Sequence, residues 1–221
     1  MQRILVTGGA GFIGSHTCLT FLKNGYEIYV LDSFINSSPK SLKRIELILK
    51  NENINIENKL HLYKGDLRDK EILNEIFSDA LSSGSPIQGV IHFAGLKAVK
   101  ESVENPLMYW DANVNSAINL LKAMEENSCR IMVFSSSATI YGLASDKPLN
   151  ENSNISPINP YGSTKVTIEN ICNDIFNTGK NDWRIINLRY FNPIGAHSSG
   201  LIGENPLGSP NNIFPIILDV A

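Results

Sequence analysis

The stretch Val6-Thr7-Gly8-Gly9-Ala10-Gly11-Phe12-Ile13-Gly14 decides which fold this sequence predicts. It follows a short apolar run, Arg3–Val6, and opens a helical pattern. In a G-x-G-x-x-G turn, one glycine takes a positive φ, one lets the backbone approach a pyrophosphate, and one lets helix and strand pack closely. The glycines with this spacing are Gly9, Gly11 and Gly14, and Gly8 is a second candidate for the tight turn. Because the following helix N-terminus offers free N–H groups, the stretch predicts a dinucleotide-binding turn.

Short apolar runs alternate with helical patterns from the start of the chain to about residue 190. We expect strands at Arg3–Val6, Glu27–Leu31, Leu60–Lys64, Gly89–Phe93, Arg130–Phe134 and Trp183–Leu188. We expect helices near 12–24, 39–51, 69–82, 106–127 and 161–178. This alternation predicts an α/β fold, a Rossmann-type doubly wound parallel sheet with right-handed crossovers.

The regular alternation stops after Arg189, which suggests a change of architecture. We therefore expect a Rossmann domain for a dinucleotide over 1–192, and over 193–221 only the start of a smaller substrate-binding domain. The last stretch, Asn212–Ala221, has helix start signals but no stop signal, so we expect the chain to be truncated at its C-terminus.

Composition narrows the class of protein. The 221 residues are 43% hydrophobic and 19% charged, and the net charge of -3 gives no reason to expect a nucleic-acid partner. No apolar run approaches the ~20 residues that span a bilayer, so we expect no membrane partner. Cys18, Cys129 and Cys172 form neither a disulfide framework nor a metal-ligand spacing. We expect buried thiols, no metal site and a reducing, cytoplasmic setting.

Two aspartates follow strands on the side where such sheets bind ligands. Asp32 lies 18 residues after Gly14, where a carboxylate reaches the adenosine ribose hydroxyls. A carboxylate there disfavours a 2′-phosphate, and no arginine follows directly, which favours NAD over NADP. Taken alone, Asp32 would more often simply begin a loop, and its combination with the glycine turn favours the ribose contact. Asp66 has two open interpretations: it accepts a hydrogen bond from an adenine amino group, or it caps the helix that begins near Asp69.

The segment His92–Lys97 leaves the fourth strand with small residues, which allow a ligand to lie close to the backbone. Lys97 is a candidate to meet a phosphate or a ribose. His92 lies within an apolar strand, and we expect it to be a packed core histidine.

The candidate chemistry comes from Ser135–Ser137, at the end of the fifth strand, and from Tyr161 and Lys165. The i,i+4 spacing places Tyr161 and Lys165 on one helix face. A free phenol has a pKa of about 10, and a nearby ammonium together with a positively charged nicotinamide would lower it. Such a tyrosine can take a proton from a sugar or alcohol hydroxyl. The alternative is an exposed tyrosine and lysine at ordinary helical spacing.

Several blocks together resemble one family. They are Thr7–Thr17, His92–Val99, Phe134–Gly142, Tyr161–Lys165, Arg189–His197 and Pro210–Pro215. With these blocks, which span the whole chain, the sequence resembles the extended short-chain dehydrogenase/reductases and, among them, the UDP-glucose 4-epimerases.

The resemblance implies site residues. For NAD they are Gly8, Gly11, Phe12, Ile13, Gly14, Asp32, Ser33, Phe34, Ile35, Asn36, Ser37, Asp66, Leu67, Phe93, Ala94, Gly95, Leu96, Lys97, Asn113, Ser137, Tyr161, Lys165 and Phe191. For the nucleotide sugar they are Lys97, Ser137, Tyr161, Asn192 and Asn212. Ala112 stands where some members carry an asparagine near the cofactor ribose, and Asn113 beside it is the candidate replacement.

The resemblance also implies an activity. It is the epimerisation of UDP-glucose and UDP-galactose at C4 by transient oxidation to a 4-keto sugar, with Ser137, Tyr161 and Lys165 as catalytic residues, in a homodimer when full length. Two alternatives stay open: another nucleotide-sugar epimerase or dehydratase, and a non-catalytic NAD-binding fragment. Sugar-nucleotide 4,6-dehydratases carry Asp-Glu after the strand-end hydroxyl, whereas this sequence has Ala138-Thr139.

Overall fold

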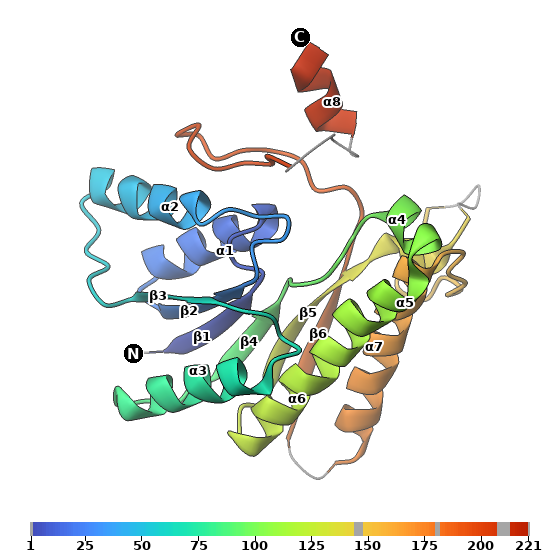
Figure 1. Cartoon of the computed structure of the whole chain (residues 1–221), viewed down its shortest axis with the longest axis horizontal. Coiled ribbons are helices and arrows are strands. Elements are labelled where there is room, and N and C mark those ends of the chain that lie inside the picture. Colours follow the sequence, from blue (N-terminus) through green and yellow to red (C-terminus); the bar gives the residue numbers. More distant parts are fainter. Residues whose placement is uncertain (1, 144–147, 180–181, 207–212, 221) are drawn as a thin grey trace.

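The computed structural model describes residues 2–143, 148–179, 182–206 and 213–220. Its centre is a six-stranded, all-parallel sheet in the order β3-β2-β1-β4-β5-β6 (Figure 1). The strands are β1 Arg3–Thr7, β2 Glu27–Asp32, β3 Leu60–Lys64, β4 Gly89–His92, β5 Ile131–Ser137 and β6 Arg184–Tyr190. This is the strand order of two βαβαβ halves joined at β1 and β4, so the predicted Rossmann-type fold is confirmed.

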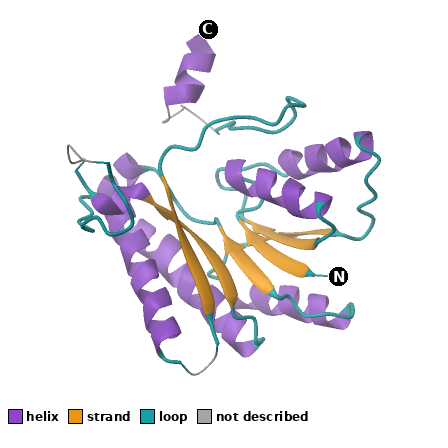
Figure 2. Ribbon diagram, turned by 180° about the vertical axis from the view of Figure 1, so that it is seen from behind, coloured by secondary structure: helices purple, strands orange, loops and turns teal. Residues whose placement is uncertain are grey.

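Helices cover both faces of the sheet (Figures 1 and 2). They are α1 Phe12–Lys23, α2 Lys40–Asn51, α3 Lys70–Ser82, α4 Val99–Glu104, α5 Pro106–Tyr109, α6 Ser116–Glu126, α7 Pro160–Asn177 and α8 Ile213–Val220. One core places Val6, Ile28 and Val30 against α1 and α2. The other places Leu5, Tyr29 and Leu31 against α3, with α6 and α7 farther along the sheet. A π-helix, η1 Trp110–Asn115, joins α5 to α6, and a 3₁₀ turn, η2 Ala138–Tyr141, follows β5.

The differences from the expected elements have local causes. The short α4 was not predicted, because Val99–Glu104 is too short and too charged to show an apolar period. β5 continues through Ser137, since its three serines pair with residues of β6: Ser135 with Leu188, Ser136 with Arg189 and Ser137 with Tyr190.

The three cysteines are buried and free, as expected. The division of the chain at residue 192 stays a prediction.

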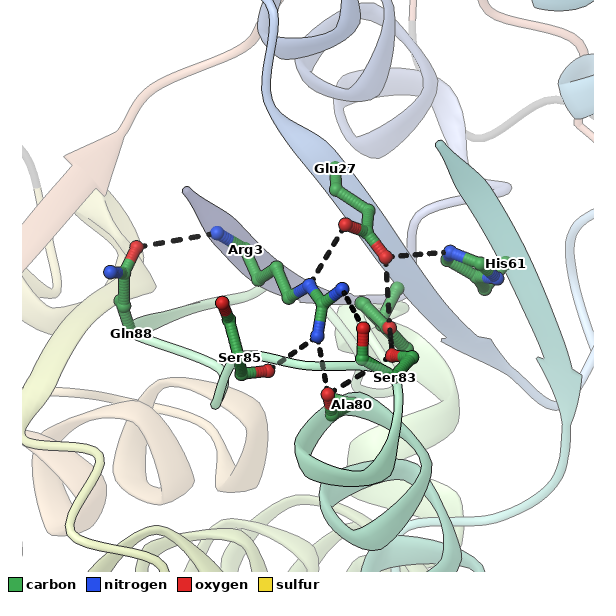
Figure 3. Close-up of polar contacts among 8 residues, drawn as sticks. Arg3, Glu27, His61, Ala80, Ser83, Ser85 and Gln88 are labelled. Carbon is green, nitrogen blue, oxygen red and sulfur yellow. Dashed lines mark hydrogen bonds and ion pairs between the residues drawn. The ribbon is translucent and has the colours of Figure 1, made fainter. Parts of the chain in front are cut away.

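A buried cluster around Arg3 joins β1, β2, β3 and the end of α3 at the amino edge of the sheet (Figure 3). The Arg3 guanidinium pairs with Glu27 at 2.8 Å and donates to the carbonyls of Ala80, Ser83 and Ser85 at the end of α3. A cation there satisfies the last carbonyls of the helix and complements its dipole. Burial raises the pKa of Glu27, but hydrogen bonds from Arg3, Tyr29 and His61 outweigh burial and hold it below its ordinary value. This cluster stabilises the edge opposite the candidate site.

No helix in the described ranges is both long and apolar enough to cross a bilayer.

His92 is a core histidine, as its apolar strand predicted. It is 1% exposed, its Nδ1 lies 2.7 Å from Thr7 Oγ1, and its ring stacks on Phe134 at 5.7 Å between centroids. Burial, with a smaller contribution from Lys165, lowers the pKa of His92 to about 3. The imidazole is therefore neutral in the folded protein.

This burial predicts an acid sensitivity. The pKa of His92 falls from 6.5 to about 3 on folding, so the unfolded chain binds more protons between these values, and stability is lost as the pH falls below 6.5. Between pH 7 and pH 5.5, His92 should remove about 1 kcal/mol from the free energy of unfolding. Urea unfolding at the two pH values measures this loss. In His92→Gln the loss should shrink by about that amount, and an equal loss in both proteins would contradict the assignment.

Candidate functional site

The predicted site residues meet at the carboxyl edge of the sheet because the central strands are parallel and their carboxyl ends are in register. Thr7 of β1 pairs with His92 of β4, and His92 pairs with Phe134 of β5. The turn after β1, the loop after β4 and the serines of β5 consequently leave the sheet on one side. In open parallel sheets, ligands bind at this edge, where the strand order reverses.

The backbone of the glycine turn gives Gly8, Gly11 and Gly14 different roles. Gly8 has φ +69°, and a Cβ there would lie 2.7 Å from the backbone nitrogen of Ala94. Gly8, not Gly9, is therefore the tight-turn residue. A Cβ on Gly14 would lie 2.3 Å from the Gly8 carbonyl oxygen, so Gly14 permits the close approach of α1 to the turn. A Cβ on Gly11 would meet only that same oxygen, at 3.3 Å, which leaves the start of α1 accessible to a ligand.

Asp32 holds the glycine turn and the next loop together. Its Oδ2 accepts from the Ala10 N–H at 2.9 Å, and its Oδ1 accepts from the Phe34 N–H at 2.9 Å and from Ser37 Oγ at 2.6 Å. A carboxylate offers about four acceptor positions, so about one remains for a ribose hydroxyl. Asp32 is 7% exposed. Of the loop residues predicted beside it, Ile35 and Asn36 are exposed, whereas Ser33, Phe34 and Ser37 are half-buried.

Asp66 does not cap a helix. α3 begins at Lys70, and Asp69 is its N-cap, accepting from the Glu71 N–H. The capping interpretation of Asp66 is wrong because Asp69 stands immediately before the helix. Asp66 instead accepts from the Arg68 backbone and guanidinium, which lower its pKa, and Arg68 also pairs with Asp111 at 2.5 Å. The adenine contact stays a prediction, as does any contact of the buried neighbour Leu67.

The loop after β4 is fixed by Asn113. Its Oδ1 accepts from the Leu96 N–H at 2.8 Å, and its Nδ2 donates to the Leu96 carbonyl and to Thr164 Oγ1, both at 3.1 Å. Asn113 is 2% exposed and lies in the π-helix η1. Most of the hydrogen-bonding capacity of Asn113 is thus used inside the protein. In the loop that it holds, Phe93, Ala94, Gly95 and Leu96 are half-buried and Lys97 is exposed.

Lys165 is a buried ammonium group with defined partners. It is 5% exposed, its Nζ donates to the Ser135 carbonyl at 2.8 Å, and it lies 4.8 Å from the centroid of the Phe134 ring. The distance from Nζ to the centroid of the Tyr161 ring is 5.7 Å, so the predicted pairing of these residues is present. Burial lowers the pKa of Lys165 to about 8, while Glu169 acts in the opposite direction.

Tyr161 lies in the first turn of α7, whose start is set by Pro160 at N1 and by the Asn159 side chain, which accepts from the Gly162 N–H. Tyr161 is 9% exposed, so the alternative of an exposed tyrosine is wrong. Burial raises its pKa, and a hydrogen bond with Ser137 lowers it by less. The ammonium of Lys165 alone therefore does not produce the lowered pKa that the spacing suggested, because burial of the phenol dominates.

The Ser137 hydroxyl is oriented by Thr139, whose N–H and hydroxyl both donate to Ser137 Oγ, at 3.2 and 2.9 Å. With its oxygen occupied as an acceptor, the proton of Ser137 is directed elsewhere. Thr139 was not predicted as a site residue; its place two residues after the serine, as the 3₁₀ turn begins, was the available signal.

Phe191 and Asn192 follow directly after β6, whose last residue, Tyr190, pairs with Ser137. Both are exposed, Phe191 by 65%, and their contacts with ligands stay predictions. Asn212 lies outside the described residues. Glu169 and Arg189 were not predicted as site residues; they form an ion pair in which Glu169 is buried and Arg189 is half-buried. A glutamate one helical turn after Lys165 was the only signal for it.

Comparison with known proteins agrees with this geometry. A protein-family model described as GDP-mannose 4,6 dehydratase matches residues 5–220. UDP-glucose 4-epimerase 2 of Arabidopsis thaliana is 50% identical over 220 residues, which cover 100% of this chain and 60% of that protein. The bifunctional UDP-glucose 4-epimerase and UDP-xylose 4-epimerase 1 of Pisum sativum is 47% identical with the same coverage. The chain thus spans 60% of the length of these curated relatives.

Solved structures give the same result. The UDP-glucose 4-epimerase of Bifidobacterium longum, in complex with NAD+ and UDP, superposes with a TM-score of 0.89 at 42% identity, over 99% of this chain and 62% of that one. The predicted resemblance to UDP-glucose 4-epimerases is confirmed. Because the family model spans nearly all of its residues, the chain belongs to the family described as GDP-mannose 4,6 dehydratase.

Proposed function

We propose that this chain forms the cofactor-binding and catalytic half of an NAD-dependent UDP-hexose 4-epimerase that interconverts UDP-glucose and UDP-galactose. The observation that carries the proposal is the buried cluster of Ser137, Tyr161 and Lys165 at the same sheet edge as the glycine turn. Relatives support it: one neighbour was crystallised with NAD+ and UDP, and the enzyme of Stenotrophomonas maltophila with NAD and formylated UDP-arabinopyranose.

The residues present fit NAD. The position of Gly11, open beside the start of α1, suits a pyrophosphate, since the first-turn N–H groups of a helix have no partner inside the helix. Asp32 retains an acceptor position for a ribose hydroxyl, and its negative charge disfavours the 2′-phosphate of NADP. In this proposal Lys165 and the loop after β4, which Asn113 holds, lie beside the nicotinamide part of the cofactor. When bound, NAD would supply the hydride acceptor and donor for the sugar C4.

In the proposed reaction Tyr161 takes the proton of the sugar 4-hydroxyl as the 4-keto sugar forms, and returns it afterwards. A phenol with a raised pKa is a poor base, so a positive charge beside Tyr161 must favour its phenolate form. Lys165 supplies such a charge below a pH of about 8. Ser137 donates its directed proton to the sugar oxygen. The chain thus provides a proton carrier and an oxygen anchor at one place.

This chain lacks the acidic residue that a dehydratase needs at the site. Elimination of water needs a group that protonates the leaving hydroxyl, and Ala138-Thr139 offers no carboxylate after Ser137. Thr139 is engaged in holding the serine oxygen. We therefore favour epimerisation, although the family model carries the name of a dehydratase.

The second alternative is a non-catalytic NAD-binding protein. Retention of Ser137, Tyr161 and Lys165 in one buried cluster argues against it, because NAD binding needs no proton carrier of this kind. Reduction of bound NAD by an added sugar nucleotide separates the two.

We further propose a homodimer in the full-length protein and a cytoplasmic setting. The dimer is supported by the exposed apolar side chains of Val103, Leu107 and Trp110, which are 61, 82 and 37% exposed along α4, α5 and η1. The setting is supported by the three free, buried thiols.

A pair of glycine variants should separate folding from cofactor binding. Gly14→Ala brings a methyl group against backbone and should lower the free energy of unfolding by about 1–3 kcal/mol or more. Gly11→Ala should lower it by about 1 kcal/mol, the effect of alanine at an N-cap, yet weaken NAD binding at least about tenfold because the methyl group stands where the pyrophosphate approaches. Urea unfolding and calorimetric titration with NAD measure both. Normal NAD affinity in Gly11→Ala would contradict the cofactor site.

The catalytic assignment predicts a second difference. With NAD bound, UDP-galactose should produce NADH fluorescence in the unmodified chain and at least about 100-fold more slowly in Tyr161→Phe, since the proton acceptor is lost. The matched control is Tyr63→Phe, which removes a phenol that donates to Asp79 of α3, away from the site. Equal rates in Tyr161→Phe and the unmodified chain would sink the role of Tyr161. No fluorescence in any of the proteins would favour the non-catalytic alternative.

A further inference from the structure

A buried ionic cluster lies directly behind the candidate catalytic residues. The Glu169 carboxylate is 3% exposed and receives a forked pair of hydrogen bonds from Arg189, Nε to Oε1 at 3.1 Å and Nη2 to Oε2 at 2.8 Å. Ser136 Oγ also donates to Oε1, at 2.5 Å. Arg189 further donates to the Tyr141 hydroxyl and to the Glu151 carbonyl. None of these contacts belongs to the cofactor site or the proton path described above.

Glu169 continues the four-residue spacing of the candidate catalytic residues Tyr161 and Lys165 along α7. Tyr161, Lys165 and Glu169 are spaced four residues apart, so they lie along one face of α7. They meet three consecutive residues of β5: Tyr161 is hydrogen-bonded with Ser137, Lys165 donates to the Ser135 carbonyl, and Glu169 accepts from Ser136 Oγ. The three contacts together set how α7 lies on the end of β5.

The buried charge of Glu169 is compensated by Arg189, and it in turn affects the charge state of Lys165. A buried carboxylate is costly unless it is paired and hydrogen-bonded, and the planar fork of Arg189 supplies two charge-assisted bonds. The titratable groups around Lys165 are Tyr161 and Glu169 on α7 and His92 on β4. His92 is neutral at ordinary pH because its pKa is about 3. Glu169 is therefore the negative charge in this group that favours the ammonium form of Lys165.

We propose that Glu169 is a positioning residue for the catalytic pair: held by Arg189 and Ser136, it fixes α7 on β5 and keeps Lys165 charged. The effect of Glu169 on catalysis rests on the proposed function. Burial lowers the pKa of Lys165 to about 8 even with Glu169 present. Loss of the carboxylate would bring Lys165 toward neutrality at physiological pH, and Tyr161 would lose its neighbouring positive charge.

The test is the pKa of Lys165 itself, measured without NAD or sugar. The chain is labelled with lysine carrying ¹³C at Cε, the Lys165 signal is assigned with Lys165→Met, and the signal is followed through a pH titration. In Glu169→Gln the pKa of Lys165 should fall by at least about half a unit. The control is Glu27→Gln, which removes an equally buried glutamate from its arginine at the opposite sheet edge and should leave Lys165 unchanged.

A second variant covers the case in which Glu169→Gln does not fold. Removing one partner of a buried ion pair is strongly destabilising, whereas replacing both by apolar residues often is not. In Glu169→Met/Arg189→Met, checked for folding by circular dichroism, the pKa of Lys165 should also fall, because Glu169 is the charge that raises this pKa in the folded protein. An unchanged pKa of Lys165 in a folded Glu169 variant, or an equal fall in Glu27→Gln, would overturn the positioning role.

The result is independent of the proposed function. A shifted pKa with no NADH formed from UDP-galactose would sink the epimerase proposal and leave the coupling of Glu169 to Lys165 intact. An unshifted pKa with normal NADH formation would sink the role of Glu169 alone.

Discussion

The register of the three central strands is the constraint on which the rest of this structure depends. Thr7, His92 and Phe134 lie side by side across β1, β4 and β5, so everything that follows these strands emerges at one edge. The row is also packed as a unit: Thr7 is hydrogen-bonded to His92, His92 stacks on Phe134, and Lys165 lies over the Phe134 ring. A slip of one residue would turn each of these side chains to the opposite face.

The two edges of the sheet carry different tasks. At the amino edge, Arg3 and Glu27 satisfy one another and close the end of α3, a purely stabilising arrangement. At the carboxyl edge, the polar groups are arranged for ligands: Gly11 leaves the start of α1 open, and Thr139 holds the Ser137 oxygen in place. Both edges contain an arginine paired with a buried glutamate, but only the Glu169–Arg189 pair lies beside groups with candidate chemistry. Position in the fold, not residue type, gives that pair its proposed role.

The strands, the glycine turn and the pairing of Tyr161 with Lys165 could be predicted because each depends on local spacing. Apolar runs mark buried parallel strands, and the i,i+4 spacing fixes a shared helix face. Other features depend on contacts between distant segments. Sequence spacing suggested Gly9 for the tight turn, whereas the close approach of Ala94 selects Gly8. Likewise, the pKa of Tyr161 is governed by burial, which spacing does not reveal. The Glu169–Arg189 pair joins α7 to β6, and nothing in either segment alone indicates it.

The most direct measurement of the proposed chemistry follows the hydrogen on the sugar C4. UDP-galactose carrying deuterium at C4 is incubated with the protein and NAD, and the products are examined by ²H NMR. We expect UDP-glucose with deuterium still at C4 and none in the water, because the same carbon is oxidised and reduced within one closed site. Deuterium at C6 together with loss of water would show elimination, and it would contradict the proposal that this protein is an epimerase.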